Sequence, residues 1–411
     1  MIKKILLPSF TAIVGIALIS GFYSSAKKQY SERVEIVNES EPNIMEWAQV
    51  DVNTGEFNPM SRLQAKSMIN QRASRAGEIG LEFAMRGPDN VGGRTRAIIE
   101  LIGKPDTLYS GGVSGGLWVS YNGGGNWQPH NQFNNLDSSS AMISSIHQDT
   151  VNKKIYVGTG CSFDAFANTA RVPWPGYGMY VSEDEGLTFQ HLSSTAPDNR
   201  YAESGESWIA VNRIRTTLEG HIYAATERGL MYSEDGGISW ENPVYTDPNQ
   251  TFNVNDKCAD VAITKSGKVI VSYYGGRVFI KDDANSEFVF SNVPTGLQAS
   301  GTRTCLAISP TDADYIYVMF IDGSACLSAI YRSTNGGVSF SKILEPHDDF
   351  TPMGQNGRCQ GVYDAAIGVS ATDPGTLFIG GITLWRFDGS LTRVATEGGA
   401  PPFQDVSPVY V

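Results

Sequence analysis

The stretch SEDGGISW, Ser233 to Trp240, is one copy of an eight-residue pattern that recurs along this chain. Each copy starts with Ser, has Asp or Asn at the third position and Gly at the fifth, and ends in an aromatic residue. In the four clear copies these residues are Ser120, Asn122, Gly124, Trp127; Ser182, Asp184, Gly186, Phe189; Ser233, Asp235, Gly237, Trp240; and Ser333, Asn335, Gly337, Phe340. Degraded copies occupy residues 280–288 and 384–391, so the chain carries six repeats of roughly 50 residues.

The residue types of this pattern predict a tight turn. A short carboxylate or amide side chain can accept hydrogen bonds from backbone N–H groups two residues ahead, and the serine hydroxyl does so more weakly. The glycine takes a backbone angle that other residues avoid, and we expect the final aromatic ring to pack inward between neighbouring sheets. Each copy should therefore hold a hairpin between two strands.

Short apolar segments before each copy supply further strands. In the third repeat, Trp208 to Ile214 and Ile222 to Ala225 precede the turn. Four strands in each repeat of roughly 50 residues are typical of a β-propeller blade. The sequence predicts an all-β propeller of four-stranded blades, with six blades visible and a partial seventh. Residues 405–411 resemble the first strand of that seventh blade, so we expect residues 1–411 to be part of a longer chain.

Composition agrees with a turn-rich, folded chain and excludes other classes. Glycine accounts for 44 of 411 residues, well above the usual ~7%. A hydrophobic content of 41% can build a large core, which argues against disorder. The net charge of −12 would repel phosphate backbones, so no nucleic-acid partner is predicted.

The N-terminus indicates export. Residues 1–26 have the features of a signal peptide, with Lys3 and Lys4 before an apolar run and the small residues Ser24, Ser25 and Ala26 at its end. An uncleaved membrane anchor is the alternative. We expect a secreted or cell-surface protein that meets the membrane only during export, through the export machinery.

The segment that follows differs from the rest of the chain. Residues 27–80 are charged and poor in glycine, and residues 59–76 have a helical pattern. We interpret them as an N-terminal segment with one helix, or alternatively as a pro-segment. The propeller is then expected over residues 81–411.

The repeated pattern resembles the Asp-box, or BNR, repeat of sialidases, sortilin-type receptors and xyloglucanase-type two-propeller glycoside hydrolases. Longer strings, Gly87 to Ile98, Tyr109 to Ser120 and Gln360 to Val369, resemble secreted propeller proteins of Bacteroidetes, many of which are type IX secretion cargo. These resemblances imply the propeller fold and carbohydrate or protein binding.

The residues that the two enzyme families need are not found at the matching positions. The Phe-Arg-Ile-Pro string of sialidases has its nearest counterpart in Asn-Arg-Ile-Arg at residues 212–215. Where xyloglucanases carry a catalytic Asp before a Gly-Gly pair, Val113 and Ser114 stand here, and valine cannot transfer a proton. The sequence favours a binding module. A carbohydrate hydrolase and a structural scaffold within a larger exported protein are the alternatives.

No cofactor or metal site is predicted, because the five histidines are scattered without ligand spacing.

One face of the predicted propeller collects the candidate ligand-binding residues. Loops before each innermost strand and loops between the second and third strands share this face, where propellers usually bind ligands. The candidates are Arg94, Asp164, Arg171, Trp174, Trp208, Arg303, Arg358, Tyr363 and Asp364. Aromatic rings with carboxylates would suit a glycan, and mixed charge would suit a protein or peptide. Alternatively, these side chains fill the axial tunnel and pair with one another.

The cysteines fall on the same face by this topology. Cys258, Cys305 and Cys359 precede innermost strands, and Cys161 and Cys326 lie in loops between second and third strands. Export favours disulfides. We expect Cys305 to pair with Cys326, since both belong to one blade, and the odd number leaves at least one thiol free or bonded elsewhere.

Overall fold

The computed structural model describes residues 94–136, 142–163, 175–197, 206–246, 253–282, 288–289, 303–354 and 359–395, together with Met68. The expected signal peptide and the expected seventh-blade strand at residues 405–411 lie outside the described residues. Of the helix expected at residues 59–76, only Met68 is described, and it is helical. Among the described residues, no helix is both long and apolar enough to cross a membrane.

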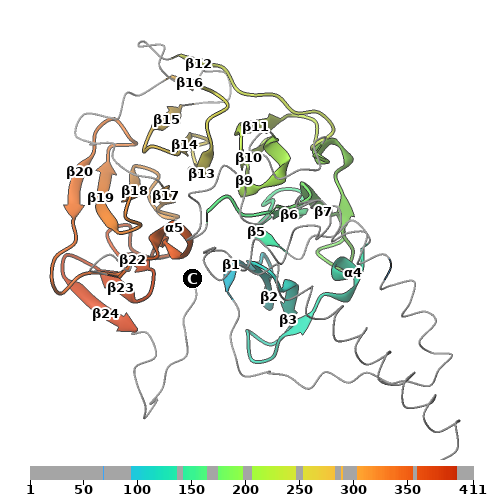
Figure 1. The fold of residues 1–411 in the computed structure, drawn as a ribbon, viewed down its shortest axis with the longest axis horizontal. Coiled ribbons are helices and arrows are strands. Elements are labelled where there is room, and N and C mark those ends of the chain that lie inside the picture. Colours follow the sequence, from blue (N-terminus) through green and yellow to red (C-terminus); the bar gives the residue numbers. More distant parts are fainter. Residues whose placement is uncertain are drawn as a thin grey trace, which may run out of the picture. The chain divides into compact units, whose positions relative to one another are not determined.

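The described residues form six sheets, in which successive strands pair antiparallel as hairpins (Figure 1). The first holds β1 (Thr95–Leu101), β2 (Lys104–Gly112), β3 (Gly116–Ser120) and β4 (Gln128–Pro129). The second holds β5 (Ile143–Gln148), β6 (Ile155–Thr159), β7 (Met179–Ser182) and β8 (Gln190–His191). The third holds β9 (Val211–Thr216), β10 (Ile222–Thr226) and β11 (Gly229–Ser233), with a bridge from Tyr232 to Glu241 in place of a fourth strand.

The remaining three sheets repeat this order. The fourth holds β13 (Cys258–Ile263), β14 (Val269–Tyr273), β15 (Val278–Lys281) and β16 (Phe288–Val289), with β12 (Tyr245–Thr246) parallel to β16. The fifth holds β17 (Arg303–Ile308), β18 (Tyr315–Ile321), β19 (Leu327–Thr334) and β20 (Ser341–Leu344). The sixth holds β21 (Ala366–Val369), β22 (Leu377–Gly380), β23 (Leu384–Phe387) and β24 (Leu391–Ala395). The short helices are α4 (Asn131–Asn134), α5 (Gly361–Asp364) and the 3-10 turns η2 (Ser193–Thr195) and η3 (Ser207–Ile209).

The first strand of each sheet is the innermost one. β1 lies beside β5, β5 beside β9, β9 beside β13, β13 beside β17 and β17 beside β21. The sheets are therefore blades around a common axis, and the predicted all-β propeller with six visible blades is confirmed (Figure 1).

The hydrophobic core is divided into layers between successive blades. Five clusters of buried side chains are found among the described residues, one for each successive pair of sheets. The strand β14 shows why: Val269 and Val271 face the third sheet, whereas Ile270 faces the fifth. Because successive residues of a strand point to opposite faces, a strand between two sheets must be apolar at nearly every position.

The repeated motif forms the turn between the third and fourth strands of its blade. In all four clear copies the serine Oγ accepts the N–H of the fifth-position glycine, at 2.7 to 2.9 Å. The Asp or Asn Oδ1 accepts a backbone N–H four residues ahead, at 2.8 to 3.0 Å. The prediction that the Asp or Asn side chain would accept the N–H two residues ahead is therefore wrong. The chain turns back on itself after this residue, which brings the N–H four residues ahead to its side-chain oxygen.

The aromatic residue that ends the motif packs against the preceding blade in three of the four clear copies. Phe189 and Phe340 are buried in this way, in the layers between the first and second and between the fourth and fifth sheets. Trp127 is 37% exposed, so the expected inward packing is wrong there. The reason is positional: among the described residues no sheet precedes the first one, so this ring has no neighbouring face to cover it.

The fifth position of the motif needs glycine for two reasons. Gly337 has φ of 89°, in the left-handed region, and a Cβ on it would lie 2.4 Å from Cδ1 of buried Ile280. The fourth position also has positive φ but points to open space, as at Gly236, where a Cβ would meet nothing within 4 Å. This difference explains why Glu185 is tolerated at the fourth position of the second copy, at φ 58°.

Alanine substitutions should separate these two effects. Gly236→Ala should cost about 1–2 kcal/mol of unfolding free energy, from the left-handed backbone alone. Gly337→Ala should cost about 1–3 kcal/mol more, because Ile280 must also move. Urea unfolding of both variants tests this ordering. Equal losses would contradict the proposed collision with Ile280.

Candidate functional site

Loops from several blades meet at one end of the axis, on the side that carries the turns between second and third strands. We call this side the axial face. Lys257, just before β13, donates to the carbonyl of Ser162 at 3.2 Å and lies 3.3 Å from Oε1 of Glu227. Ser162 follows β6 and Glu227 follows β10, so the second, third and fourth sheets meet here. The predicted grouping of these loops on one face is confirmed.

A buried phenyl ring lies at the centre of this contact. Phe163 is 1% exposed, with Nζ of Lys257 at 5.4 Å and Cζ of Arg303 at 5.3 Å from its centroid. Cations at this distance are attracted to an aromatic face. The loop after β6 therefore reaches across to the fifth sheet, and its ring is covered by cations.

Arg303, the first residue of β17, holds the segment that leads into the sixth sheet. Its guanidinium donates to the carbonyls of Gly361 at 3.2 Å, Val362 at 2.9 Å and Ala365 at 3.0 Å. These carbonyls belong to α5 and to the residue that follows it. The fifth and sixth blades are thus joined at the axial face through one side chain.

Two carboxyl groups on this face have raised pKa values. Burial raises the pKa of Asp364 to about 6, and Arg303 opposes this shift. Burial also raises the pKa of Glu227, against the effect of Lys257. Among the described residues, Oδ1 of Asp364 and Oε2 of Glu227 are buried without a hydrogen-bond partner. Both groups therefore hold a proton more readily than an exposed carboxyl group.

Deeper along the axis, Asp260 joins three innermost strands. It is 3% exposed. Its Oδ1 accepts Nε of Arg213 from β9 at 3.0 Å and its own strand's Val261 N–H at 2.9 Å. Its Oδ2 accepts the N–H of Leu306 from β17 at 2.9 Å.

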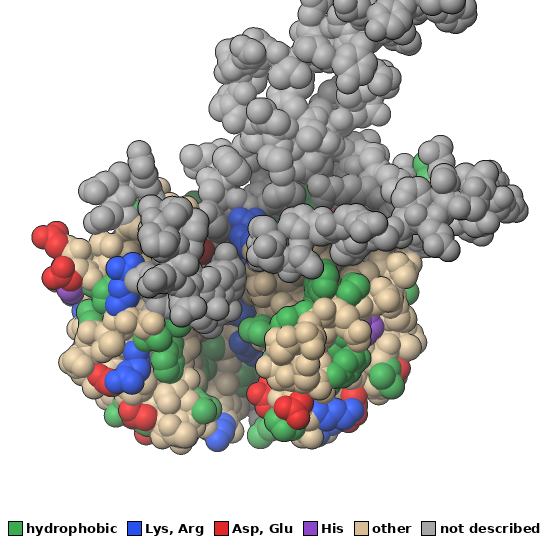
Figure 2. All heavy atoms as spheres, turned by 90° about the horizontal axis from the view of Figure 1, so that it is seen from below, with side chains coloured by type: hydrophobic (Ala, Val, Ile, Leu, Met, Phe, Trp, Pro, Cys, Tyr) green, Lys and Arg blue, Asp and Glu red, His purple; other side chains and the backbone are tan. Residues whose placement is uncertain are grey.

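Arginines from alternate innermost strands gather around this carboxylate. Burial and the nearby Arg213 lower the pKa of Arg215 to about 10. Burial lowers the pKa of Arg96 to about 10, with Arg303, Arg94 and Arg213 contributing to the decrease. These mutual effects place the arginines of β1, β9 and β17 close together. Figure 2 shows Lys and Arg atoms inside the hollow between the sixth sheet, on the left, and the first sheet, on the right.

The structure brings some of the predicted site residues together. Arg303 and Arg94 lie near Asp364, and both oppose the rise in its pKa that burial causes. Trp208 lies elsewhere: it is 8% exposed and packs on Trp240, 4.8 Å between centroids, in the layer between the second and third sheets. Asp164, Arg171, Trp174, Arg358 and the side chain of Tyr363 lie outside the described residues.

Several axial residues were not among the predicted candidates: Arg96, Arg213, Arg215, Glu227, Lys257 and Asp260. A signal for two of them is visible in β9, where charged residues at positions 213 and 215 alternate with apolar ones. Alternate residues of a strand share a face, and on an innermost strand a shared charged face lies along the axis.

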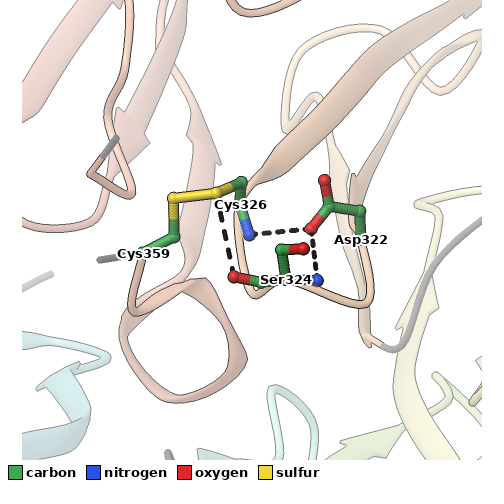
Figure 3. Close-up of a disulfide and its surroundings, with 4 residues drawn as sticks. All are labelled: Asp322, Ser324, Cys326 and Cys359. Atoms are coloured by element: carbon green, nitrogen blue, oxygen red, sulfur yellow. Dashed lines mark hydrogen bonds between the residues drawn. A yellow bond between two sulfur atoms is a disulfide. The ribbon is translucent and has the colours of Figure 1, made fainter. Parts of the chain in front are cut away.

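The predicted disulfide is wrong. Cys326 is bonded to Cys359, with a Cα–Cα distance of 4.9 Å (Figure 3). Cys305 is a buried free thiol. Cys305 lies within β17 and its Sγ approaches the carbonyl of Ala365 at 3.8 Å, whereas Cys326 lies at the outer end of the β18–β19 turn. Membership of one blade did not bring the two thiols together, because the turn leans toward the next blade.

The disulfide lies beside a backbone contact of the same two segments. Oδ1 of Asp322 accepts the N–H groups of Ser324 at 2.8 Å and Cys326 at 3.0 Å, which shapes the turn (Figure 3). The N–H of Gly361 donates to the carbonyl of Ala325 at 2.8 Å. The β18–β19 turn and α5 are therefore held together by one covalent bond and one hydrogen bond.

Among the residues described, no group of three His, Cys, Asp or Glu could hold a metal ion.

Several solved structures resemble this chain at low sequence identity. No known family matches the sequence, and no curated protein is similar to it. Among solved structures, an ancestral GH74 enzyme is 15% identical, with a TM-score of 0.49, over 74% of this chain and 38% of that one. The GH74 xyloglucanase of Xanthomonas campestris is 15% identical, with a TM-score of 0.43, over 72% and 52%. YCF48 from Cyanidioschyzon merolae is 13% identical, with a TM-score of 0.44, over 78% and 88%. This chain thus spans about two fifths of the length of the ancestral GH74 enzyme and about half the length of the Xanthomonas campestris xyloglucanase.

Loss of the disulfide should destabilise the protein without preventing folding. Its sulfurs close a loop of 33 residues, so removing it with Cys326→Ser and Cys359→Ser should cost about 3–4 kcal/mol. Alkylation in denaturant should modify three cysteines without reductant and five with it. A mapped peptide that joins Cys305 to Cys326 would contradict the pairing seen here.

Asp260→Ala should have one of the largest single effects on stability. Removing it leaves the Arg213 guanidinium without its buried partner and the Leu306 N–H without an acceptor, at a cost of about 3–5 kcal/mol. Asp282→Ala is the control, since Asp282 pairs with Lys268 but is 71% exposed, and its loss should cost no more than about 1 kcal/mol. Urea unfolding compares the two. Similar losses would show that Asp260 does not join the strands.

Proposed function

We propose that this chain is an exported Asp-box propeller that binds a protein segment or a glycan at its axial face, with a protein segment the better fit. The observation that carries the proposal is that five blades direct charged side chains to the axis, from the axial face inward. Arg213 and Asp260 come from the third and fourth blades, Arg303 and Asp364 from the fifth and the start of the sixth, and Arg96 from the first.

The chemistry of this face favours a polar, extended ligand. Mixed charges in a partly enclosed setting suit the backbone and charged side chains of a peptide. Phe163 is covered by Lys257 and Arg303, so its ring does not offer a flat surface on which a sugar could stack. Tyr274, in the turn after β14, is an aromatic side chain on the axial face that is 48% exposed, with Nζ of Lys257 at 5.8 Å from its ring centroid.

The repeated motif supports membership of the Asp-box class. The bonds of its serine and of its Asp or Asn side chain recur in four blades with nearly equal distances. The N-terminal sequence, 1–26, supports export to the cell surface or beyond. We propose that the chain is related to secreted propellers of Bacteroidetes, on the two strings at the first blade and the one at the sixth blade that resemble them.

The binding proposal is tested with peptide and glycan arrays probed with the whole chain. Two exposed tyrosines on opposite faces provide matched variants: Tyr274 on the axial face, and Tyr121, 55% exposed, in the first repeated turn. Tyr274→Ala should weaken binding about 5–30-fold, as expected for an aromatic contact at an interface, and Tyr121→Ala should leave it unchanged. Absence of any ligand, or equal loss in both variants, would refute binding at this face.

A hydrolase is the second candidate, favoured by Asp364. A carboxylic acid with a pKa of about 6 is suited to donate a proton to a leaving group. Activity would then rise as the pH falls through 6, because the acid must be protonated to act. Release of reducing sugar from a polysaccharide panel, lost in Asp364→Asn, would support this function. A panel without turnover would exclude it for those substrates.

A further inference from the structure

The axial arginines include two that keep guanidinium N–H groups free of hydrogen bonds to the described residues. Arg213 uses Nε to bind Asp260 and keeps a third of its side chain exposed, although it lies on an innermost strand. Arg215 donates through one Nη to the adjacent carbonyl of Ile214 at 2.8 Å. The remaining N–H groups of both side chains have no hydrogen-bond acceptor among the described residues.

These two side chains point the same way. They are two residues apart on β9. Alternate residues of a strand lie on the same face, with their Cα atoms about 7 Å apart. Burial and the charge of Arg213 lower the pKa of Arg215 to about 10, which shows that the two cations repel each other in a poorly solvated place. An anion between them would relieve this repulsion.

Asp260 offsets part of the charge of this pair, because it raises the pKa of Arg213 and opposes the lowering of the pKa of Arg215. Asp260 is bound to Arg213 and to two backbone N–H groups. His147 on β5 bonds Thr216 of β9 at 2.9 Å, and burial together with Arg215 and Arg213 lowers its pKa to about 3, so it is neutral. Arg96 adds a further positive charge nearby. A local positive site is thus built inside a protein whose net charge is −12.

We propose that Arg213 and Arg215 bind a carboxylate that the ligand extends down the axis from the axial face, so that the peptide bound there is acidic. This inference rests on the proposed binding function and names its ligand chemistry. A guanidinium offers paired N–H donors that match the two oxygens of a carboxylate, and two such groups on one face can hold one carboxylate from both sides. The carboxylate can come from Asp or Glu side chains or from the end of a chain.

Three labelled peptides distinguish these sources: hexaglutamate with an amidated end, hexaglutamine with an amidated end, and hexaglutamine with a free carboxylate. Fluorescence anisotropy with the whole chain measures their affinities. Hexaglutamate should bind at least tenfold more tightly than amidated hexaglutamine, since hydrogen bonds between charged groups are strong. Tighter binding of the free-carboxylate peptide alone would also support the proposal and would assign the site to a chain end.

Variants connect the affinity to these residues. Arg215→Gln is the main test, because Arg215 bonds only an adjacent carbonyl and its replacement should leave thermal unfolding unchanged. It should weaken hexaglutamate binding about tenfold. Arg213→Lys keeps the charge and should weaken binding less. Arg386→Gln is the control, since Arg386 pairs with Asp388 at the surface and is 47% exposed, and it should have no effect.

Each negative result of these binding measurements leads to a different conclusion. Equal binding of all three peptides, or equal affinities of the Arg215→Gln and Arg386→Gln variants, would overturn carboxylate recognition. A neutral array ligand that still depends on Tyr274 would then leave the proposed binding function intact. Binding of tetragalacturonate and of neither carboxylate peptide would overturn the peptide assignment.

Discussion

The carboxylate of Asp260 is the interaction on which the arrangement of the blades depends. Innermost strands of neighbouring blades approach one another without forming a common sheet, so their polar groups need partners from side chains. One carboxylate oxygen of Asp260 accepts the Leu306 N–H, and the other accepts the Nε–H of Arg213. An unpaired buried donor or charge would cost more than any single apolar contact contributes.

The same solution recurs around the axis. Ser145 of β5 accepts the N–H of Ile214 at 3.1 Å, Asn212 of β9 donates to the carbonyl of Cys258 at 2.8 Å, and Arg303 donates to Ala365. Each bond joins one blade to the next by a side chain of an innermost strand. Function is linked to this architecture, because a strand that must carry polar side chains toward the axis also delivers the charges that could bind a ligand there.

Much of the fold was predictable from the sequence because it depends on local patterns. The repeated motif sets its own turn through bonds within seven residues, and the alternation of strands with turns gives the blades. The candidate site was only partly predictable. Arg303 and Asp364 were found from their places before or at the start of innermost strands, but Trp208 packs between sheets and Arg213, Arg215 and Asp260 were not selected. Their roles depend on which strands become neighbours, a relation between residues 46 or more positions apart.

The sequence by itself determined the repeat, the turn and the number of visible blades, since each rests on contacts between residues close along the chain. The tertiary structure alone decided which cysteines bond and which charges meet. Cys326 bonds Cys359 and not Cys305, because the β18–β19 turn leans toward the segment that enters the next blade. Arg213 and Arg215 became a half-buried positive pair because the packing of blades places one face of β9 along the axis.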